Sequence, residues 1–74
     1  MAWHRVESSW VDAVDYQAET GTLYVRYKDK QGNPTVTCRY DNVDPSTGLG
    51  ILSAPSKGKY VHRFLFRRPY TVVS

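Results

Sequence analysis

The chain has a single cysteine, no acidic residue after Asp44 and no long apolar run. A single cysteine, Cys38, excludes an internal disulfide framework and fits a reducing compartment. No stretch reaches the roughly 20 apolar residues that a membrane helix needs. The first residues are interrupted by His4, Arg5 and Glu7 and do not resemble a secretory signal. We therefore expect a cytoplasmic protein without a membrane partner.

With 74 residues, the chain has room for one hydrophobic core, and we expect a single domain over residues 1–74. A chain of this size buries only about 60% of its unfolded surface. Two Trp, six Tyr and two Phe residues can compensate for the small core. Self-association would bury further surface, so the small size favours a homo-oligomer.

The missing acidic residues divide the chain electrostatically. Residues 1–44 carry five basic and seven acidic side chains, a net charge of −2, whereas residues 45–74 carry five basic and no acidic ones, a net charge of +5. This asymmetry indicates an anionic partner for the C-terminal part. The alternative is a solvated face on an ordinary helix. The total net charge of +3 is small for non-specific binding to a nucleic-acid duplex.

Three segments show the alternation of apolar and polar residues that is typical of strands: residues 10–16, 22–28 and 35–40. Turns at residues 17–21 and 30–33 separate them, and the N-terminal residues can add an edge strand. In the first segment, strict alternation places Asp12 and Asp15 on opposite faces, which argues against a pair of catalytic carboxylates.

The other two segments define the two faces of the expected sheet. The core face is predicted to contain Leu23, Val25, Val36 and Cys38, and the exposed face Tyr24, Arg26, Lys28 and Arg39. Aromatic and guanidinium planes can stack on a nucleobase while the cations bind its phosphate. The alternative is an ordinary strand face stabilised by cross-strand pairs.

Two short helices are expected after the strands. Asp44 caps the first and Pro45 opens it, although Gly48 and Gly50 each cost about 1 kcal/mol relative to Ala. The second runs from about residue 57 to residue 67 and ends before Pro69. Its apolar stripe, which should dock on the sheet, consists of Tyr60, Val61, Phe64 and Leu65. The predicted fold class is therefore α+β, with a small antiparallel sheet of three to four strands followed by two short helices packed on one face.

The start of the second helix is the first candidate binding site. Ser56 can cap this helix, and the free N–H groups and dipole of its first turn can attract an anion. Gly58 would let a ligand approach the backbone closely. The alternative is an ordinary cap followed by solvated lysines. The candidate ligand-binding residues are Ser56, Lys57, Gly58, Lys59, Tyr60, Arg63 and Arg67 on the helix, and Tyr24, Arg26 and Arg39 on the sheet.

Catalytic chemistry has little support in the sequence. Cys38 falls on the predicted core face, where a buried thiol is usually inert. His4 and His62 are far apart, and neither belongs to a recognised nucleophile or base motif. One Cys and two His without a familiar spacing do not predict a zinc site. We expect no enzymatic activity, no cofactor and no metal.

Four short segments, residues 6–14, 22–27, 38–43 and 52–61, together with Tyr70, carry a resemblance to a known family. They resemble the KTSC domain family, which is named for a domain at the C-terminus of some lysyl-tRNA synthetases. Ser56, Gly58 and Tyr60 form the most specific pattern, Ser-x-Gly-x-Tyr, whereas residues 38–40 and His62 depart from the family pattern. The resemblance implies a non-enzymatic module with a sheet and a helix pair, found in free-standing bacterial and phage proteins, and it suggests RNA binding.

We expect a small protein that captures a phosphate-bearing, nucleotide-type ligand, for instance to sequester a signalling nucleotide in a phage-type setting. RNA binding through the basic helix and the exposed sheet face is the first alternative. A protein-interaction module that uses Trp3, Trp10 and Phe66 is the second.

Overall fold

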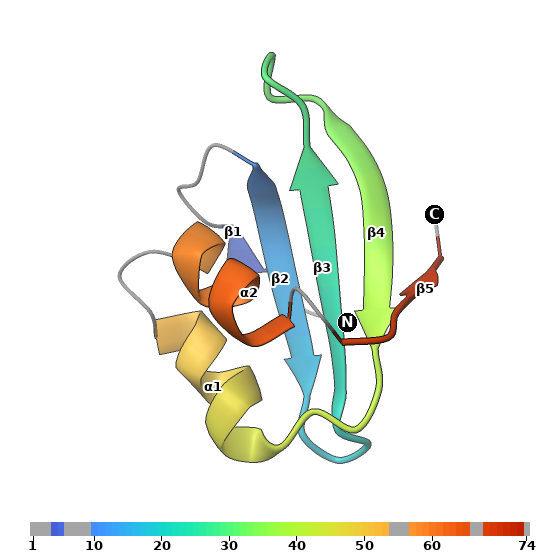
Figure 1. The fold of residues 1–74 in the computed structure, drawn as a ribbon, viewed down its shortest axis with the longest axis vertical. Coiled ribbons are helices and arrows are strands. Elements are labelled where there is room, and N and C mark those ends of the chain that lie inside the picture. The colour runs from blue at the N-terminus through green and yellow to red at the C-terminus, as the bar shows by residue number, and fades with distance from the viewer. Residues whose placement is uncertain (1–3, 6–9, 54–56, 66–67, 74) are drawn as a thin grey trace.

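The computed structural model describes residues 4–5, 10–53, 57–65 and 68–73. These residues form a five-stranded antiparallel sheet with the order β1-β2-β3-β4-β5, and the helices that cover one face lie between β4 and β5 in the chain (Figure 1). The long central strands are β2 (Val11–Gln17), β3 (Thr22–Lys28) and β4 (Pro34–Tyr40). The edge strands β1 (His4–Arg5) and β5 (Thr71–Val72) have two residues each. The predicted α+β fold is confirmed, and both chain ends contribute an edge strand.

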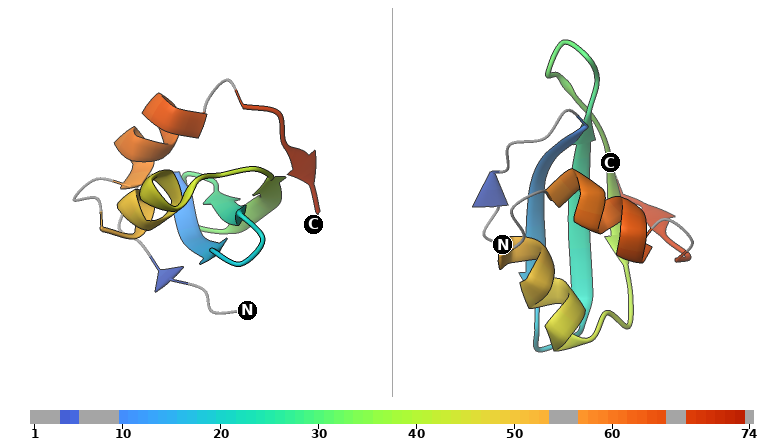
Figure 2. Two further views of the ribbon diagram at one scale, coloured as in Figure 1. Left: turned by 90° about the horizontal axis from the view of Figure 1, so that it is seen from below. Right: turned by 60° about the vertical axis from the view of Figure 1, so that its left-hand side comes forward.

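The two helices are α1 (Pro45–Ser53) and α2 (Lys57–Leu65). Both lie on the same side of the central strands, whereas β1 lies on the other side (Figure 2). Neither helix is long and apolar enough to cross a membrane. Between the helices and the sheet lies the hydrophobic core, which consists of Val11, Val14, Leu23, Val25, Cys38, Tyr40, Val43, Ile51, Val61 and Leu65. Val36, predicted for this face, is 41% exposed, since it lines a pocket described below.

The register of β2 departs from the strict alternation expected from the sequence. Val11 pairs with Tyr27, but the next pair joins Ala13 to Arg26, so the register shifts within β2. Two residues of β2, Asp12 and Ala13, therefore lie opposite one residue of β3. This is the arrangement of a β-bulge, in which one strand carries one extra residue.

The bulge changes which face each residue of β2 occupies. Val11 and Val14, three positions apart, are both fully buried in the core. Asp12 contacts Arg26 on the outer face, and Asp15 lies on that same face because its partner Tyr24 is two residues from Arg26. The expectation that Asp12 and Asp15 lie on opposite faces is therefore wrong.

The two glycines of α1 allow the helix to pack closely against aromatic rings. A Cβ atom at Gly48 would overlap the ring of Tyr16, and one at Gly50 would overlap the hydroxyl of Tyr60. Tyr16 belongs to β2 and Tyr60 to α2, so these contacts hold α1 against both its neighbours. The packing offsets the poor helix propensity of glycine, which costs about 1 kcal/mol per residue.

The predicted cap of α1 is confirmed. The carboxylate of Asp44 accepts hydrogen bonds from the backbone N–H of Thr47 at 3.1 Å, from the Thr47 hydroxyl at 2.8 Å and from the Ser46 hydroxyl. These three donors lower the pKa of Asp44 from 3.8 to about 2. The helix thus begins at a fixed residue, because the cap satisfies one of its orphan N–H groups.

The loop before α1 is tied to the sheet by two further hydrogen bonds. The Tyr16 hydroxyl donates to the carbonyl of Val43 at 2.7 Å, and the Val43 N–H donates to the carbonyl of Gly21 at 2.8 Å. Gly21, in the turn between β2 and β3, has the positive φ of 70° expected from the sequence. Asn42 also adopts a positive φ, 57°, which lets the chain leave β4 and turn into the helix layer.

Candidate ligand-binding site

The structure separates the two groups of residues that the sequence suggested as binding surfaces. The buried residues Val61 and Leu65 dock α2 on the sheet face that contains Leu23 and Val25. Tyr24, Arg26 and Arg39 alternate with these core residues and therefore project from the opposite face. The helix group and the sheet group lie on different sides of the molecule and do not form one site.

The structure describes the exposure of three residues of the helix group. Lys59 and Arg63 are exposed, and Tyr60 is half-buried against Gly50. Lys57 and Gly58 are the first two residues of α2. Ser56 and Arg67 lie outside the described residues, so the predicted anion site at the helix start stays a prediction.

The basic residues of the sheet group are paired with acids. Arg26 Nε lies 2.8 Å from Asp12 Oδ2, in a pair whose side chains are 26% and 8% exposed. Arg39 Nε lies 3.3 Å from Asp41 Oδ1 without the alignment of a hydrogen bond. Tyr24 is directly opposite Arg39 on the neighbouring strand. These ion pairs offset much of the positive charge that the sequence suggested for this face.

A pocket of about 270 Å³ lies on the helix side of the sheet, at the end of the core. It is lined by the residue before β2, by residues of β3 and β4, by one residue of α2 and by one of the C-terminal segment: Trp10, Tyr27, Val36, Cys38, Tyr40, Val61 and Tyr70. Four of these seven residues are aromatic. We refer to this cavity as the aromatic pocket.

The four aromatic rings of the pocket form a connected surface. Trp10 stacks on Tyr27 with ring centroids 5.3 Å apart and an interplanar angle of 16°. The hydroxyl oxygens of Tyr27 and Tyr40 lie 2.8 Å apart, within hydrogen-bonding distance. The ring of Tyr70 lies 5.9 Å from that of Tyr40 at an angle of 47°. Tyr70 is 60% exposed and forms the outer wall.

Three titratable groups of the aromatic pocket, those of Tyr27, Tyr40 and Cys38, remain neutral at neutral pH. Burial raises the pKa of Tyr27, and the hydrogen bond with Tyr40 raises it further. Burial is also the main cause that raises the pKa values of Tyr40 and Cys38. A neutral, buried thiol is a poor nucleophile. The pocket therefore offers flat apolar surface and hydroxyl hydrogen bonding.

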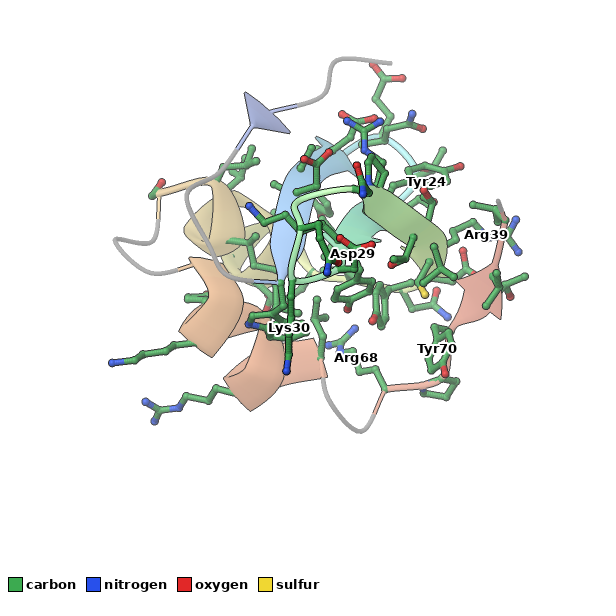
Figure 3. All side chains as sticks on the ribbon, turned by 90° about the horizontal axis from the view of Figure 1, so that it is seen from above. Tyr24, Asp29, Lys30, Arg39, Arg68 and Tyr70 are labelled. Carbon is green, nitrogen blue, oxygen red and sulfur yellow. The ribbon has the colours of Figure 1, made fainter. Side chains whose placement is uncertain are left out.

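A second hollow, of about 460 Å³, adjoins the aromatic pocket at Tyr70, which lines both. Its lining includes a carboxylate, an amide and a guanidinium and consists of Asp41, Asn42, Arg68, Pro69, Tyr70 and Thr71. Arg68 Nη1 donates to the carbonyl oxygen of Asn42 at 3.2 Å, and the backbone N–H of Arg68 donates to that of Leu65 at 3.0 Å. Figure 3 shows Arg68 and Tyr70 on one side of the central strands and Tyr24 on the other. We refer to this cavity as the polar hollow.

Sequence reasoning did not predict this site. Its only sequence signal was a surplus of aromatic residues: Tyr27 and Tyr40 fell on the expected core face, where buried hydroxyls need partners. Nothing in the sequence places Arg68 beside Asn42, because the two are 26 residues apart. Within the described part of the chain, no three His, Cys, Asp or Glu side chains gather into a group that could hold a metal ion.

Comparison with known proteins assigns the family. The family model of the KTSC domain matches residues 7–70, so the chain belongs to the KTSC domain family. The crystal structure of a KTSC domain protein from Yersinia pestis has the same fold, with a TM-score of 0.81 and 20% sequence identity over 99% of this chain and 97% of that chain. No curated protein matches the chain significantly. The link to lysyl-tRNA synthetases stays a prediction.

Proposed function

We propose that this KTSC domain is a non-enzymatic binding protein for a phosphate-bearing, nucleotide-type ligand. The base enters the aromatic pocket, and the phosphate lies beside Arg68 in the polar hollow. The observation that carries the proposal is that Tyr70 lines both cavities, so the aromatic pocket shares a wall with the hollow that contains the Arg68 guanidinium. A nucleotide has the same division into a flat neutral part and an anionic part.

The aromatic pocket suits a nucleobase for two physical reasons. Stacking of a base on an aromatic side chain is worth about 1–3 kcal/mol and requires only a free ring face. Tyr70, the most exposed of the four rings, can supply that face. In addition, only one hydrogen can lie between the hydroxyls of Tyr27 and Tyr40, so the other hydroxyl hydrogen can point to a ligand.

The polar hollow suits a phosphate. A guanidinium carries five N–H donors in a fixed plane, and the contact with Asn42 uses one nitrogen of Arg68. The remaining donors can bind phosphate oxygens in the bidentate manner that arginine favours. The hydroxyl of Thr71 lines the same hollow. The exposed Lys59 and Arg63 add long-range attraction for an anion.

The same proposal includes self-association. Two apolar side chains at β5, outside both cavities, remain exposed: Val72 at 57% and Val73 at 43%. A homo-oligomer that covers this edge would gain the apolar burial that a chain of 74 residues lacks. Sedimentation of the purified protein tests this part, and a monomer at every concentration would contradict it. A protein that sequesters a signalling nucleotide, in a bacterial or phage setting, needs only to bind that nucleotide and does not need to catalyse a reaction.

Calorimetry with purified protein tests the binding proposal. The ligands are linear and cyclic adenine and guanine nucleotides, and the fluorescence of Trp10 in a Trp3→Phe background gives an independent signal from the pocket. We expect Arg68→Ala and Tyr70→Ala to weaken binding about 10-fold or more, the equivalent of one lost stacking or charged contact. Lys30→Ala, at an exposed position in the hairpin between β3 and β4 that lines neither cavity, is the matched control and should change affinity less than about 3-fold.

Two outcomes would contradict the proposal. One is the absence of heat, fluorescence change and thermal shift with every nucleotide. The other is tight binding of single-stranded RNA that weakens steeply with salt and depends on Tyr24 and Arg39, which would place the function on the outer face of the sheet. A protein captured from nuclease-treated lysate, with no nucleotide bound, would favour an interaction module.

A further inference from the structure

The polar hollow contains a carboxylate as well as a guanidinium. Asp41 and Arg68 line the same cavity, and the Asp41 side chain is 56% exposed. Its charge is only partly offset, because Arg39 approaches Oδ1 at 3.3 Å without a well-aligned hydrogen bond. A ligand phosphate at Arg68 therefore shares its cavity with a negative side chain.

We infer that the site selects nucleotides whose phosphate carries a single negative charge, such as a cyclic mononucleotide or another phosphodiester, and discriminates against di- and triphosphates. This inference rests on the proposed function and names its ligand class. One negative charge can be neutralised at Arg68. Each further phosphate charge in the same cavity is repelled by Asp41, and like charges in a partly desolvated site are costly.

The position of Arg68 restricts where the phosphate can lie. Its Nη1 is hydrogen-bonded to the carbonyl of Asn42, the residue that follows Asp41 in the loop after β4. The guanidinium and the carboxylate are therefore positioned by the same short stretch of chain. A polyphosphate that extends from Arg68 along residues 41–42 approaches Asp41.

Asp41 can also favour the ligand it selects. A carboxylate accepts hydrogen bonds from hydroxyl and amino groups. The ribose hydroxyl and the exocyclic amino group of a nucleotide are such donors, whereas a second phosphate offers only acceptor oxygens. These donors are common to all adenine nucleotides, so Asp41 can hold any of them, and the repulsion of extra negative charge is what discriminates among them.

Calorimetric titrations of the full chain with 3′,5′-cyclic AMP, AMP and ATP at constant ionic strength test this inference. We expect cyclic AMP to bind at least about 10-fold more tightly than ATP. Asp41→Asn should reduce this preference to less than about 3-fold, chiefly by improving the binding of ATP. Arg68→Ala should weaken the binding of both ligands.

The matched control is Asp29→Asn, which removes one negative charge in the hairpin between β3 and β4, at the other end of these strands from Asp41. The Oδ1 of Asp29 accepts hydrogen bonds from the N–H groups of Gln31 and Asn33, and asparagine keeps this acceptor. The Asp29→Asn control should leave the ratio of the affinities for cyclic AMP and ATP unchanged.

The outcomes separate this inference from the proposed function. If ATP binds as tightly as cyclic AMP and Arg68→Ala abolishes both, the site is correct and the charge selectivity is wrong. If Asp41→Asn and Asp29→Asn change the ratio of the affinities for cyclic AMP and ATP equally, Asp41 is not the selective residue and the inference fails. If no nucleotide binds, the proposed function fails as well.

Discussion

The hydroxyl oxygens of Tyr27 and Tyr40 lie 2.8 Å apart on the wall of the aromatic pocket, where each hydroxyl is the other's partner. Tyr40 is only 4% exposed, so its hydroxyl has little access to water. A buried polar group that loses its partner costs more than the hydrogen bond contributed. The pair therefore couples the stability of the fold to the shape of the pocket.

Replacing one member of this pair should destabilise the protein. We expect Tyr27→Phe or Tyr40→Phe to lower the free energy of unfolding by about 1–2 kcal/mol, because the remaining hydroxyl is left without its partner. The double variant should cost less than the sum, since no orphaned hydroxyl remains. Urea unfolding of the four proteins measures the coupling. Strictly additive effects would show that the two hydroxyls do not depend on each other.

The same residues predict the behaviour of the protein at alkaline pH. Burial and the Tyr40 hydrogen bond raise the pKa of Tyr27 above its ordinary value of 10.0, so the folded state holds this proton more tightly than the unfolded state does. The associated stability is present below pH 10 and is lost as the pH rises above it. Urea unfolding at increasing pH should show a steeper alkaline loss in the wild type than in Tyr27→Phe. Identical profiles would contradict the prediction.

The cap of α1 predicts the opposite dependence at acidic pH. The pKa of Asp44 is about 2 in the folded protein and 3.8 when it has no partners, so its contribution is present above pH 3.8 and is lost as the pH falls towards 2. Asp44→Ala should therefore reduce stability at pH 7 by more than at pH 2. Asp44→Asn is the control, because it keeps a cap oxygen that does not titrate. A constant difference between wild type and Asp44→Ala at all pH values would show that the charge has no role.

The contact between α1 and β2 predicts an unusual response to a helix-favouring substitution. Alanine normally stabilises a helix relative to glycine by about 1 kcal/mol. At Gly48 the added methyl would overlap the Tyr16 ring, and we expect Gly48→Ala to lower stability by about 1–3 kcal/mol. Leu49→Ala, at a position that is 53% exposed, is the control and should change stability little. A more stable Gly48→Ala protein would mean that Tyr16 does not lie against the helix.

The parts of the fold that were predictable from the sequence depend on local chemistry. Asp44 and Pro45 form a cap and a first helical residue within two positions, and the alternation of β3 and β4 shows directly which side chains face the core. The bulge at Asp12 was not predictable, because a bulge is defined by the register of two strands. The sequence of β2 alone is compatible with regular alternation.

The candidate site was not predictable for a related reason. The aromatic pocket combines Trp10, which precedes β2, and Tyr27 and Tyr40 from the sheet with Tyr70, which follows the helices. Hydrophobic patterning assigns these residues to the core and does not distinguish a filled core from a cavity. Charge patterning emphasised the exposed Lys59 and Arg63, whereas the only cation lining either cavity, among the described residues, is Arg68.

Two ion pairs between described residues, Arg26–Asp12 and Arg39–Asp41, should contribute very differently to stability. Arg26 and Asp12 are 2.8 Å apart with side chains that are 26% and 8% exposed, whereas Arg39 and Asp41 are 3.3 Å apart with side chains that are 38% and 56% exposed. Exposed pairs contribute about 0–1 kcal/mol, but a buried carboxylate that loses its cation is strongly destabilised. We expect Arg26→Ala to cost about 2 kcal/mol or more and Arg39→Ala less than about 1 kcal/mol in urea unfolding.

A double-mutant cycle separates this ion pair from the loss of side-chain packing. Asp12→Asn combined with Arg26→Ala should recover part of the stability lost in Arg26→Ala, since the buried negative charge is removed together with its partner. Asp41→Asn combined with Arg39→Ala should recover almost nothing, because water already solvates that pair. Equal costs for Arg26→Ala and Arg39→Ala would indicate that the bulge does not bury Asp12, and that the outer face is more open to an anionic ligand than the structure implies.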